Sequence, residues 1–226
     1  MSLTSQTSKV KAIIFDVGGV LASNLDWYRG WGEWLKDEEM KEKVEKSRKV
    51  AWENLKEQKD YGEERFWKEC LEPAGLYNEE NLRKCEKYIR EGFKPYHSSL
   101  ALAQRLQSRG YIVGICSNHS QEWFTEIYER FCFDSAFQNP HLVVASYQVN
   151  CSKPNFDIFN VVMDRIHSVD SSVVPSQVVL IDDQLKNTSS ASSFGFAPIL
   201  FDAHVQPPFD LVSQLVSLGV DAAEHQ

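Results

Sequence analysis

The chain has 226 residues, of which 42% are hydrophobic and 25% are charged, and its formal net charge is -8. This composition is typical of a globular protein, and the negative charge argues against non-specific binding to nucleic acid or to an anionic membrane surface. The length is sufficient for one domain or two. No stretch is apolar for long enough to span a bilayer.

The cysteines indicate a reducing compartment. Their number is odd, their spacing fits no zinc pattern, and none forms a CxxC pair, so we expect free thiols. The first nine residues are polar and contain no apolar signal core. We therefore expect a cytoplasmic protein with these five free cysteines: Cys70, Cys85, Cys116, Cys132 and Cys151.

The first predicted strand covers residues 10–15 and ends in a single carboxylate, Asp16, which a Gly18-Gly19 turn follows. The strand is apolar and rich in Ile, as is typical of a buried parallel strand. Ligands bind at the carboxyl ends of such strands in open α/β sheets. Asp16 is therefore a candidate functional residue.

Residues 25–95 differ in composition from the rest of the chain. They contain five of the six tryptophans, no histidine and many Glu and Lys residues, which favour helices. Trp27, Trp31 and Trp34 recur on one helical face. We expect about four helices, with the last three at residues 41–58, 63–70 and 79–91, and a break at residues 73–75. We expect the tryptophans to pack these helices together; the alternative is that some of them line a substrate pocket.

From residue 96 onward, predicted helices and strands alternate, which implies right-handed crossovers and a parallel sheet. Pro154 is expected in the first turn of one of these helices. The predicted strands cover residues 111–116, 142–146, 178–181 and 197–201, and the predicted helices cover residues 99–110, 121–131, 154–167, 187–194 and 209–218.

Polar side chains follow several of these strands, so we expect them to gather at one edge of the sheet. A carboxylate can attack phosphorus, and two or three carboxylates suit a hard cation such as Mg²⁺. A hydroxyl, an amide and a lysine can bind phosphoryl oxygens. The residues concerned are Asp16, Ser117, Asn118, Lys153, Asp182 and Asp183.

Four ordered motifs resemble those of the haloacid dehalogenase-like hydrolase superfamily, over roughly residues 10–202. They are Phe15-Asp16-Val17-Gly18-Gly19-Val20-Leu21, Cys116-Ser117-Asn118, Ser152-Lys153-Pro154 and Ile181-Asp182-Asp183. The resemblance implies an α/β fold, with a Rossmann-like parallel sheet core at residues 1–24 and 96–226. Residues 25–95 would form an inserted helical cap, similar to caps of soluble epoxide hydrolase N-terminal phosphatase domains and of glucose-1-phosphate phosphatases.

The resemblance also implies roles for individual residues. Asp16 would be the nucleophile and a Mg²⁺ ligand, together with the Gly18 backbone carbonyl. Lys153 would pair with Asp16 and with phosphate. The other roles implied are metal binding by Asp183 and by Asp182, directly or through water, phosphoryl binding by Ser117 and Asn118, and support from Asn187.

Gly18 departs from the pattern of the family. Related phosphatases usually carry a second Asp there, which protonates the leaving group and then activates water. The protein could use substrate or water instead, use another residue, or have lost catalysis and kept binding. His119 is one alternative acid–base residue, since histidine titrates near neutral pH; the other interpretation is a solvated loop histidine.

Each residue also has a structural interpretation. Asp16 could cap a helix, Ser117 and Asn118 could form a turn, Lys153 could be a surface lysine, and the two adjacent acids could cap the helix that follows them. The favoured prediction is a Mg²⁺-dependent phosphomonoesterase acting on a small phosphorylated metabolite, as a monomer or a homodimer. The alternatives are an inactive binding protein and a metal-independent 2-haloacid dehalogenase.

Overall fold

The fold is organised around a parallel five-stranded sheet, seen in a computed structural model that describes residues 9–27 and 35–223. The strand order is β3-β2-β1-β4-β5, so β1 is central and pairs with β2 and β4. The predicted parallel α/β sheet is thus confirmed. The strands are β1 (Ala12–Phe15), β2 (Ile112–Ser117), β3 (Val143–Ala145), β4 (Val178–Asp182) and β5 (Ala197–Leu200).

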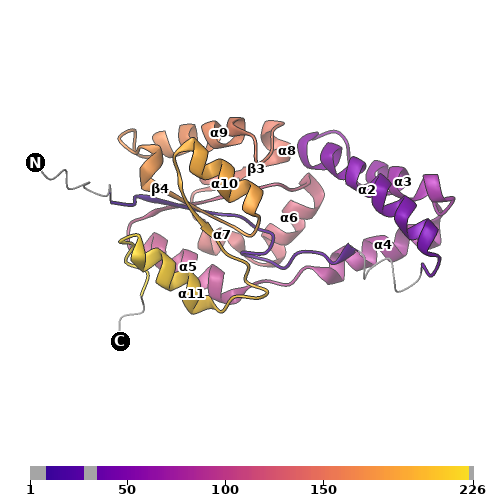
Figure 1. The fold of residues 1–226 in the computed structure, drawn as a ribbon, viewed down its shortest axis with the longest axis horizontal. Coiled ribbons are helices and arrows are strands. Elements are labelled where there is room, and N and C mark those ends of the chain that lie inside the picture. Colours follow the sequence, from indigo (N-terminus) through magenta and orange to yellow (C-terminus); the bar gives the residue numbers. More distant parts are fainter. Residues whose placement is uncertain (1–8, 28–34, 224–226) are drawn as a thin grey trace, which may run out of the picture.

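Helices cover both faces of the sheet (Figure 1). α9 (Phe156–His167) and α10 (Leu185–Phe194) lie on one face, and α5 (His97–Ser108) and α11 (Pro208–Ser217) lie on the other. The side chains of β1 alternate between these layers. Ala12 and Ile14 belong to the cluster under α9 and α10, whereas Ile13 and Phe15 belong to the cluster under α5 and α11.

The chain leaves the sheet region after β1 and returns before α5 along two neighbouring segments. Ala22 forms isolated bridges with Gly18 and with Pro95. The amide of Ser23 donates to the carbonyl of Lys94 at 2.8 Å. These bonds place the two ends of the intervening helical segment side by side.

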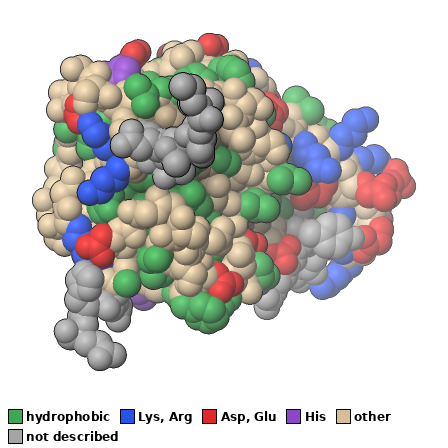
Figure 2. Space-filling view, turned by 60° about the vertical axis from the view of Figure 1, so that its left-hand side comes forward, with side chains coloured by type: hydrophobic (Ala, Val, Ile, Leu, Met, Phe, Trp, Pro, Cys, Tyr) green, Lys and Arg blue, Asp and Glu red, His purple; other side chains and the backbone are tan. Residues whose placement is uncertain are grey.

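The helical segment contains α2 (Glu38–Glu57), α3 (Glu63–Leu71), the 3-10 turn η1 (Glu72–Ala74) and α4 (Glu79–Gly92) at one end of the molecule (Figure 1). Val44, Ala51 and Leu55 bury one face of α2. Their cluster is continuous with the one under α5 and α11. Figure 2 shows acidic and basic side chains crowded over this end, as expected for helices with one buried and one solvated face. The division into two domains stays a prediction.

Several predicted boundaries are wrong for local reasons. The helix expected from residue 154 begins at Phe156, because Asn155 caps it by accepting from the amide of Asp157 at 3.0 Å. Pro154 therefore precedes the helix. The short helices α7 (Phe133–Ala136) and α8 (Ser146–Val149) were not predicted.

The remaining elements agree with the sequence more closely. The predicted break corresponds to η1, after which Gly75 takes a left-handed conformation with φ 68°. The helix predicted at residues 121–131 is α6 (Gln121–Arg130). Trp31 and Trp34 lie outside the described residues. No helix within residues 9–27 and 35–223 is both long and apolar enough to cross a membrane.

Candidate active site

The carboxyl ends of β1 and β4 bring three acidic residues together. The two strands are parallel neighbours, and Phe15 lies opposite Ile181. The residues that follow this pair therefore lie at the same edge of the sheet. Asp16 follows β1, Asp182 ends β4 and Asp183 comes next. Each of these carboxylates offers one oxygen, and the three oxygens lie within 4.8 Å of one another.

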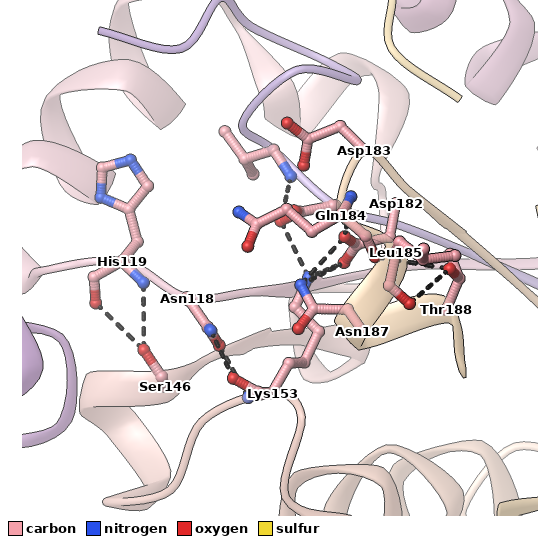
Figure 3. A network of polar contacts seen from close by, with 12 residues as sticks. Asn118, His119, Ser146, Lys153, Asp182, Asp183, Gln184, Leu185, Asn187 and Thr188 are labelled. Atoms are coloured by element: carbon pink, nitrogen blue, oxygen red, sulfur yellow. Dashed lines mark hydrogen bonds and ion pairs between the residues drawn. The ribbon is translucent and has the colours of Figure 1, made fainter. Parts of the chain in front are cut away.

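Lys153 connects two of these carboxylates from the loop before α9. Its Nζ lies 3.0 Å from Asp16 Oδ1 and 2.5 Å from Asp182 Oδ2, and the side chain is fully buried. Asn118, just after β2, holds the backbone of Lys153 from both sides (Figure 3). Its amide nitrogen donates to the Lys153 carbonyl, and its oxygen accepts from the Lys153 amide, each at 2.8 Å. Asn118 therefore positions the lysine.

Asp182 is held by more than Lys153 (Figure 3). The side-chain amide of Asn187 donates to Asp182 Oδ1 at 2.9 Å and reaches Oδ2 at 3.1 Å, and the Gln184 amide donates to Oδ1 at 2.9 Å. Both carboxylate oxygens of Asp182 thus accept hydrogen bonds at the start of α10. Asn187, expected to support the site, lies directly against Asp182.

Asp183 is placed differently from Asp182. Its Oδ2 accepts a hydrogen bond from the side-chain amide of Asn24 at 2.7 Å. Its Oδ1 is buried and has no hydrogen-bond partner among the described residues. Gly19 makes room for this carboxylate, since a Cβ there would lie 2.5 Å from Asp183 Oδ2, and Gly19 also has φ +71°. An unpartnered carboxylate oxygen beside two other carboxylates suits an oxygen-binding cation.

The charged groups of the site shift one another's pKa values. Burial raises the pKa of Asp16 to about 7; Lys153 opposes this shift, while Asp182 and Asp183 add to it. Burial alone would lower the pKa of Lys153, but the charges of Asp16 and Asp182 outweigh it and raise this pKa above its usual value. Burial also raises the pKa of Asp183. A bound cation would favour the ionised form of all three carboxylates.

Asn24 occupies the space that a side chain at position 18 would need. A Cβ built on Gly18 would lie 2.5 Å from Asn24 Oδ1. The same Asn24 side chain holds Asp183 through its nitrogen. The position that the sequence leaves without a side chain is therefore partly filled by a neutral carboxamide.

A cavity of about 190 Å³ lies over the site. Asp16, Asn118, Gln184 and Asn187 line it, and together with Lys153, Asp182 and Asp183 they form what we call its polar base. Trp27, Trp52, Phe93 and Trp123 also line it and form what we call its aromatic wall. The other lining residues are Gly18, Asn24, Leu25, Glu53, Lys56, His119 and Lys186.

The aromatic wall is made by rings from distant parts of the sequence. Trp52 of α2 stacks on Trp123 of α6 with ring centroids 5.9 Å apart and an interplanar angle of 13°. Trp27 lies 5.8 Å from Trp123, and the Arg48 guanidinium lies 5.0 Å from the centre of the Trp27 ring. Two tryptophans of the helical segment, Trp27 and Trp52, thus line the cavity. Trp67 is instead buried in the hydrophobic core, as expected for a packing residue.

His119 is buried, so the interpretation as a solvated loop residue is wrong. It is only 6% exposed and packs near the rings of Trp52, Phe93 and Phe124. Burial lowers the pKa of His119 to about 4, and its Nδ1 has no hydrogen-bond partner among the described residues. At neutral pH the imidazole is therefore uncharged.

Two serines join the end of α2 to the region around the site. The Ser146 hydroxyl accepts from the His119 amide at 3.0 Å (Figure 3). The same hydroxyl donates to the Lys56 carbonyl. The Ser152 hydroxyl donates to the Glu57 carboxylate. Ser117, predicted to bind phosphoryl oxygens, ends β2 and is 1% exposed, and it is not among the cavity-lining residues.

The sequence did not single out Asn24, Lys56 or Glu53. Trp52 and Lys56 are four residues apart and therefore lie on the same face of a helix. This spacing was the one feature of the sequence that could have linked Lys56 to the cavity. Lys56 is 4% exposed and pairs with Glu53 at 2.6 Å, so this charged residue does not belong to the solvated face of α2.

A family model described as haloacid dehalogenase-like hydrolase matches residues 13–200. No curated protein matches the chain. A solved structure of a predicted HAD-like family hydrolase from Porphyromonas gingivalis is 21% identical, with a TM-score of 0.70 over 92% of this chain and 98% of that one.

Two further structures show the same fold. A HAD family enzyme from Bacteroides thetaiotaomicron, solved with magnesium, is 19% identical, with a TM-score of 0.71 over 90% of this chain and 99% of that one. Another structure of that enzyme contains magnesium and inorganic phosphate. The L-2-haloacid dehalogenase of Xanthobacter autotrophicus, with chloropropionic acid covalently bound, is 17% identical. Its TM-score is 0.57 over 95% of this chain and 85% of that one.

Proposed function

Because the chain belongs to the haloacid dehalogenase-like hydrolase family, we propose that this hydrolase is a Mg²⁺-dependent phosphatase of a small phosphomonoester, with Asp16 as its nucleophile. The observation that carries the proposal is the bridge from Lys153 to Asp16 and Asp182, beside the unpartnered oxygen of Asp183. This arrangement combines a nucleophile, a fixed cation and ligands for a metal ion.

The proposed reaction has two steps. A carboxylate oxygen of Asp16 forms a bond to phosphorus while the bond from phosphorus to the leaving oxygen breaks, which gives an aspartyl-phosphate. Water then attacks the same phosphorus, the bond to Asp16 breaks, and inorganic phosphate leaves. Lys153 holds Asp16 by its Oδ1 and supplies positive charge beside the phosphoryl oxygens.

Asp16 and Asp183 would hold the Mg²⁺, with the Gly18 carbonyl and with Asp182 directly or through water. The cation would offset the negative charge of the carboxylates and of the phosphoryl group. Because both oxygens of Asp182 already accept hydrogen bonds, we favour binding through water for this residue. Magnesium in structures of a protein with the same fold supports this part of the proposal.

The substrate would be small. A cavity of about 190 Å³ is below the range of roughly 300–1,000 Å³ that is usual for drug-sized ligands. α2 carries part of the aromatic wall, so movement of the helical segment would open and close the cavity.

The proposal is tested by assaying a panel of small phosphomonoesters with and without Mg²⁺, using the protein and its Asp16→Asn variant. We expect Mg²⁺-dependent release of phosphate, and a decrease on the order of 10⁴-fold or more in the variant. A matched control is Ser108→Ala, at an exposed position at the end of α5, which should leave turnover unchanged. Absence of phosphate release from every ester would rule out the phosphatase.

A carbon-centred reaction is the second candidate, because a dehalogenase needs no acid at position 18. Asp16 would then attack the carbon of a 2-haloacid and displace the halide. Halide release from 2-chloropropionate without added metal would support this candidate. Binding of Mg²⁺ and phosphate with neither reaction would indicate a binding protein.

A further inference from the structure

We propose that the substrates are phosphomonoesters whose leaving group is a weak base, and specifically small aryl phosphates. This inference rests on the proposed phosphatase function and adds a substrate class to it. It follows from which side chains surround the cavity and from what they can do with a proton.

The position next to the nucleophile contains no acid. Gly18 has no side chain, and Asn24 Oδ1 lies 2.5 Å from where the Cβ of residue 18 would be. A carboxamide cannot donate a titrating proton. Asn24 is also bonded to Asp183, so an acidic side chain at position 18 would have to displace a residue that already holds the acidic cluster.

Two of the other titratable side chains that line the cavity, His119 and Lys56, do not replace this acid. His119 is neutral at pH 7 because burial in aromatic surroundings disfavours its charged form. Lys56 is buried and its ammonium pairs with Glu53 at 2.6 Å. Lys153 is fully buried, and its ammonium is shared between Asp16 and Asp182. Glu53 and Lys186 are exposed, so variants of these two belong in the test.

The consequence concerns the first step of the reaction. When Asp16 attacks phosphorus, the leaving oxygen takes the electron pair of the breaking bond. No enzyme group protonates it, so it departs as an anion and takes a proton from water afterwards. A phenolate can leave in this way far more easily than an alkoxide, because it is the weaker base.

The aromatic wall favours the same class of leaving group. Trp52 and Trp123 are stacked, and Trp27 and Phe93 complete a cavity side made of flat rings. An aryl group can pack against such rings in offset or edge-on geometry. The cavity volume of about 190 Å³ restricts the leaving group to a compact ring.

The second step lacks a base for the same reason. No acidic side chain at position 18 activates the water that attacks the aspartyl-phosphate. Hydrolysis of this intermediate should then be slow and identical for all substrates, because the leaving group has already departed. For good substrates we therefore expect a common kcat together with a kcat/KM that depends on the leaving group.

The experiment measures kcat and kcat/KM for a series of substituted phenyl phosphates and for small alkyl phosphates, with Mg²⁺ present. Without a general acid, log kcat/KM should fall steeply as the leaving group becomes more basic. Alkyl phosphates should be slower by roughly 10²–10⁴-fold, the usual contribution of general acid catalysis. Equal kcat/KM values for aryl and alkyl phosphates would overturn the proposal.

Three variants test whether another side chain of the cavity protonates the leaving group. Glu53→Gln, His119→Gln and Lys186→Met should each leave the slope of log kcat/KM against leaving-group basicity unchanged. A steeper slope in any of them identifies an enzyme acid and overturns the proposal. Conversely, Gly18→Asp combined with Asn24→Ala should flatten the slope, whereas Asn24→Ala alone should not.

A binding measurement separates the contribution of the aromatic wall to substrate affinity from the reactivity of the leaving group. The Asp16→Asn variant should bind phenyl phosphate more tightly than an alkyl phosphate by calorimetry, and Trp52→Ala should reduce this preference. Equal affinities would remove the argument from the aromatic wall. If no phosphomonoester is hydrolysed at all, the phosphatase function itself fails; if alkyl phosphates react as fast as aryl phosphates, only the present inference fails.

Discussion

The polar base and the aromatic wall of the cavity are held in place by opposite kinds of interaction. In the base, short hydrogen bonds fix each group: Lys153 has two carboxylate partners, and Asn118 holds its backbone by two bonds. In the wall, ring packing holds the side chains, and Trp123 Nε1 has no hydrogen-bond partner among the described residues; the same is true of Nδ1 of the neighbouring His119.

This difference separates two tasks. Charges and hydrogen bonds hold a reacting group in one geometry, which a nucleophile requires. Packed rings offer area without fixed direction, which suits recognition of a leaving group. Changes in the base should therefore affect rate and stability together, whereas changes in the wall should affect the choice of substrate. The predictions below test that separation, beginning with the largest expected effect and ending with the smallest.

Lys153→Met should have the largest effect on both stability and rate. It leaves two buried carboxylates without their cation, and breaking a buried ion pair in this way typically costs about 3–5 kcal/mol. Turnover should fall by roughly 10²–10³-fold, because one electrostatic stabiliser is lost. Urea unfolding at pH 7 and phosphate-release assays measure the two effects.

Lys84→Met is the matched control for this substitution. Lys84 is partly exposed on α4 and pairs with Glu80 at 2.7 Å in an i,i+4 arrangement, so solvent screens the pair and its loss should change stability little. If Lys153→Met destabilises the protein no more than this control, the polar base does not depend on its charge bridge.

Trp52→Ala should lower kcat/KM for aryl phosphates by about tenfold, corresponding to the loss of roughly 1.4 kcal/mol of ring contact. Stabilisation of the protein by Mg²⁺ should be unchanged, because the acidic cluster is not touched. Trp52→Phe keeps a stacked ring and should keep most of the activity. A loss of Mg²⁺ stabilisation in Trp52→Ala would show that wall and base are coupled.

His119→Gln should make the protein less sensitive to acid. The pKa of His119 is about 4 in the folded protein and about 6.5 when unfolded, so the unfolded state binds the proton first as the pH falls. The stability due to neutral His119 is therefore present above pH 6.5 and is lost progressively toward pH 4. From pH 7 to pH 5 the native protein should lose roughly 2 kcal/mol more than the variant.

The measurement is urea unfolding of both proteins across this pH range, with metal absent. The comparison of the two proteins isolates His119, because the carboxylates of the polar base titrate in both. Parallel stability curves would mean that His119 is protonated without penalty in the folded state.

Asn24→Ala should have the smallest effect, about 1 kcal/mol, because it removes one hydrogen bond to Asp183 at an exposed position. We expect a modest weakening of Mg²⁺ binding, read as a smaller increase of the unfolding midpoint on addition of Mg²⁺. Ser108→Ala again provides the control. An unchanged response to Mg²⁺ would show that Asn24 does not orient Asp183.

The polar base was largely predictable from the sequence, and the aromatic wall was not. Asp16, Asp182 and Asp183 follow apolar runs, and parallel pairing of β1 and β4 brings the ends of such runs together. Trp52 and Trp123 belong to α2 and α6, and their stacking depends on how these helices pack, which neither local sequence specifies.

Two local features were also beyond sequence reasoning. The proximity of Asn24 to Gly18 results from a return of the backbone after β1, with Ala22 bridged to Gly18. The burial of His119 results from rings contributed by α2, α6 and the segment before α5. A loop position in the sequence therefore did not mean exposure to solvent.

The paired segments at Ala22 and Pro95 have a consequence for how such proteins diversify. The amide of Ser23 is bonded to Lys94, and the amide of Tyr96 to Leu21, so the two ends of the helical segment meet as a closed stem. Loop-closure entropy depends only weakly on the length between such ends. Helical segments of different size can therefore be exchanged on this stem, giving new pockets above the same acidic cluster and lysine.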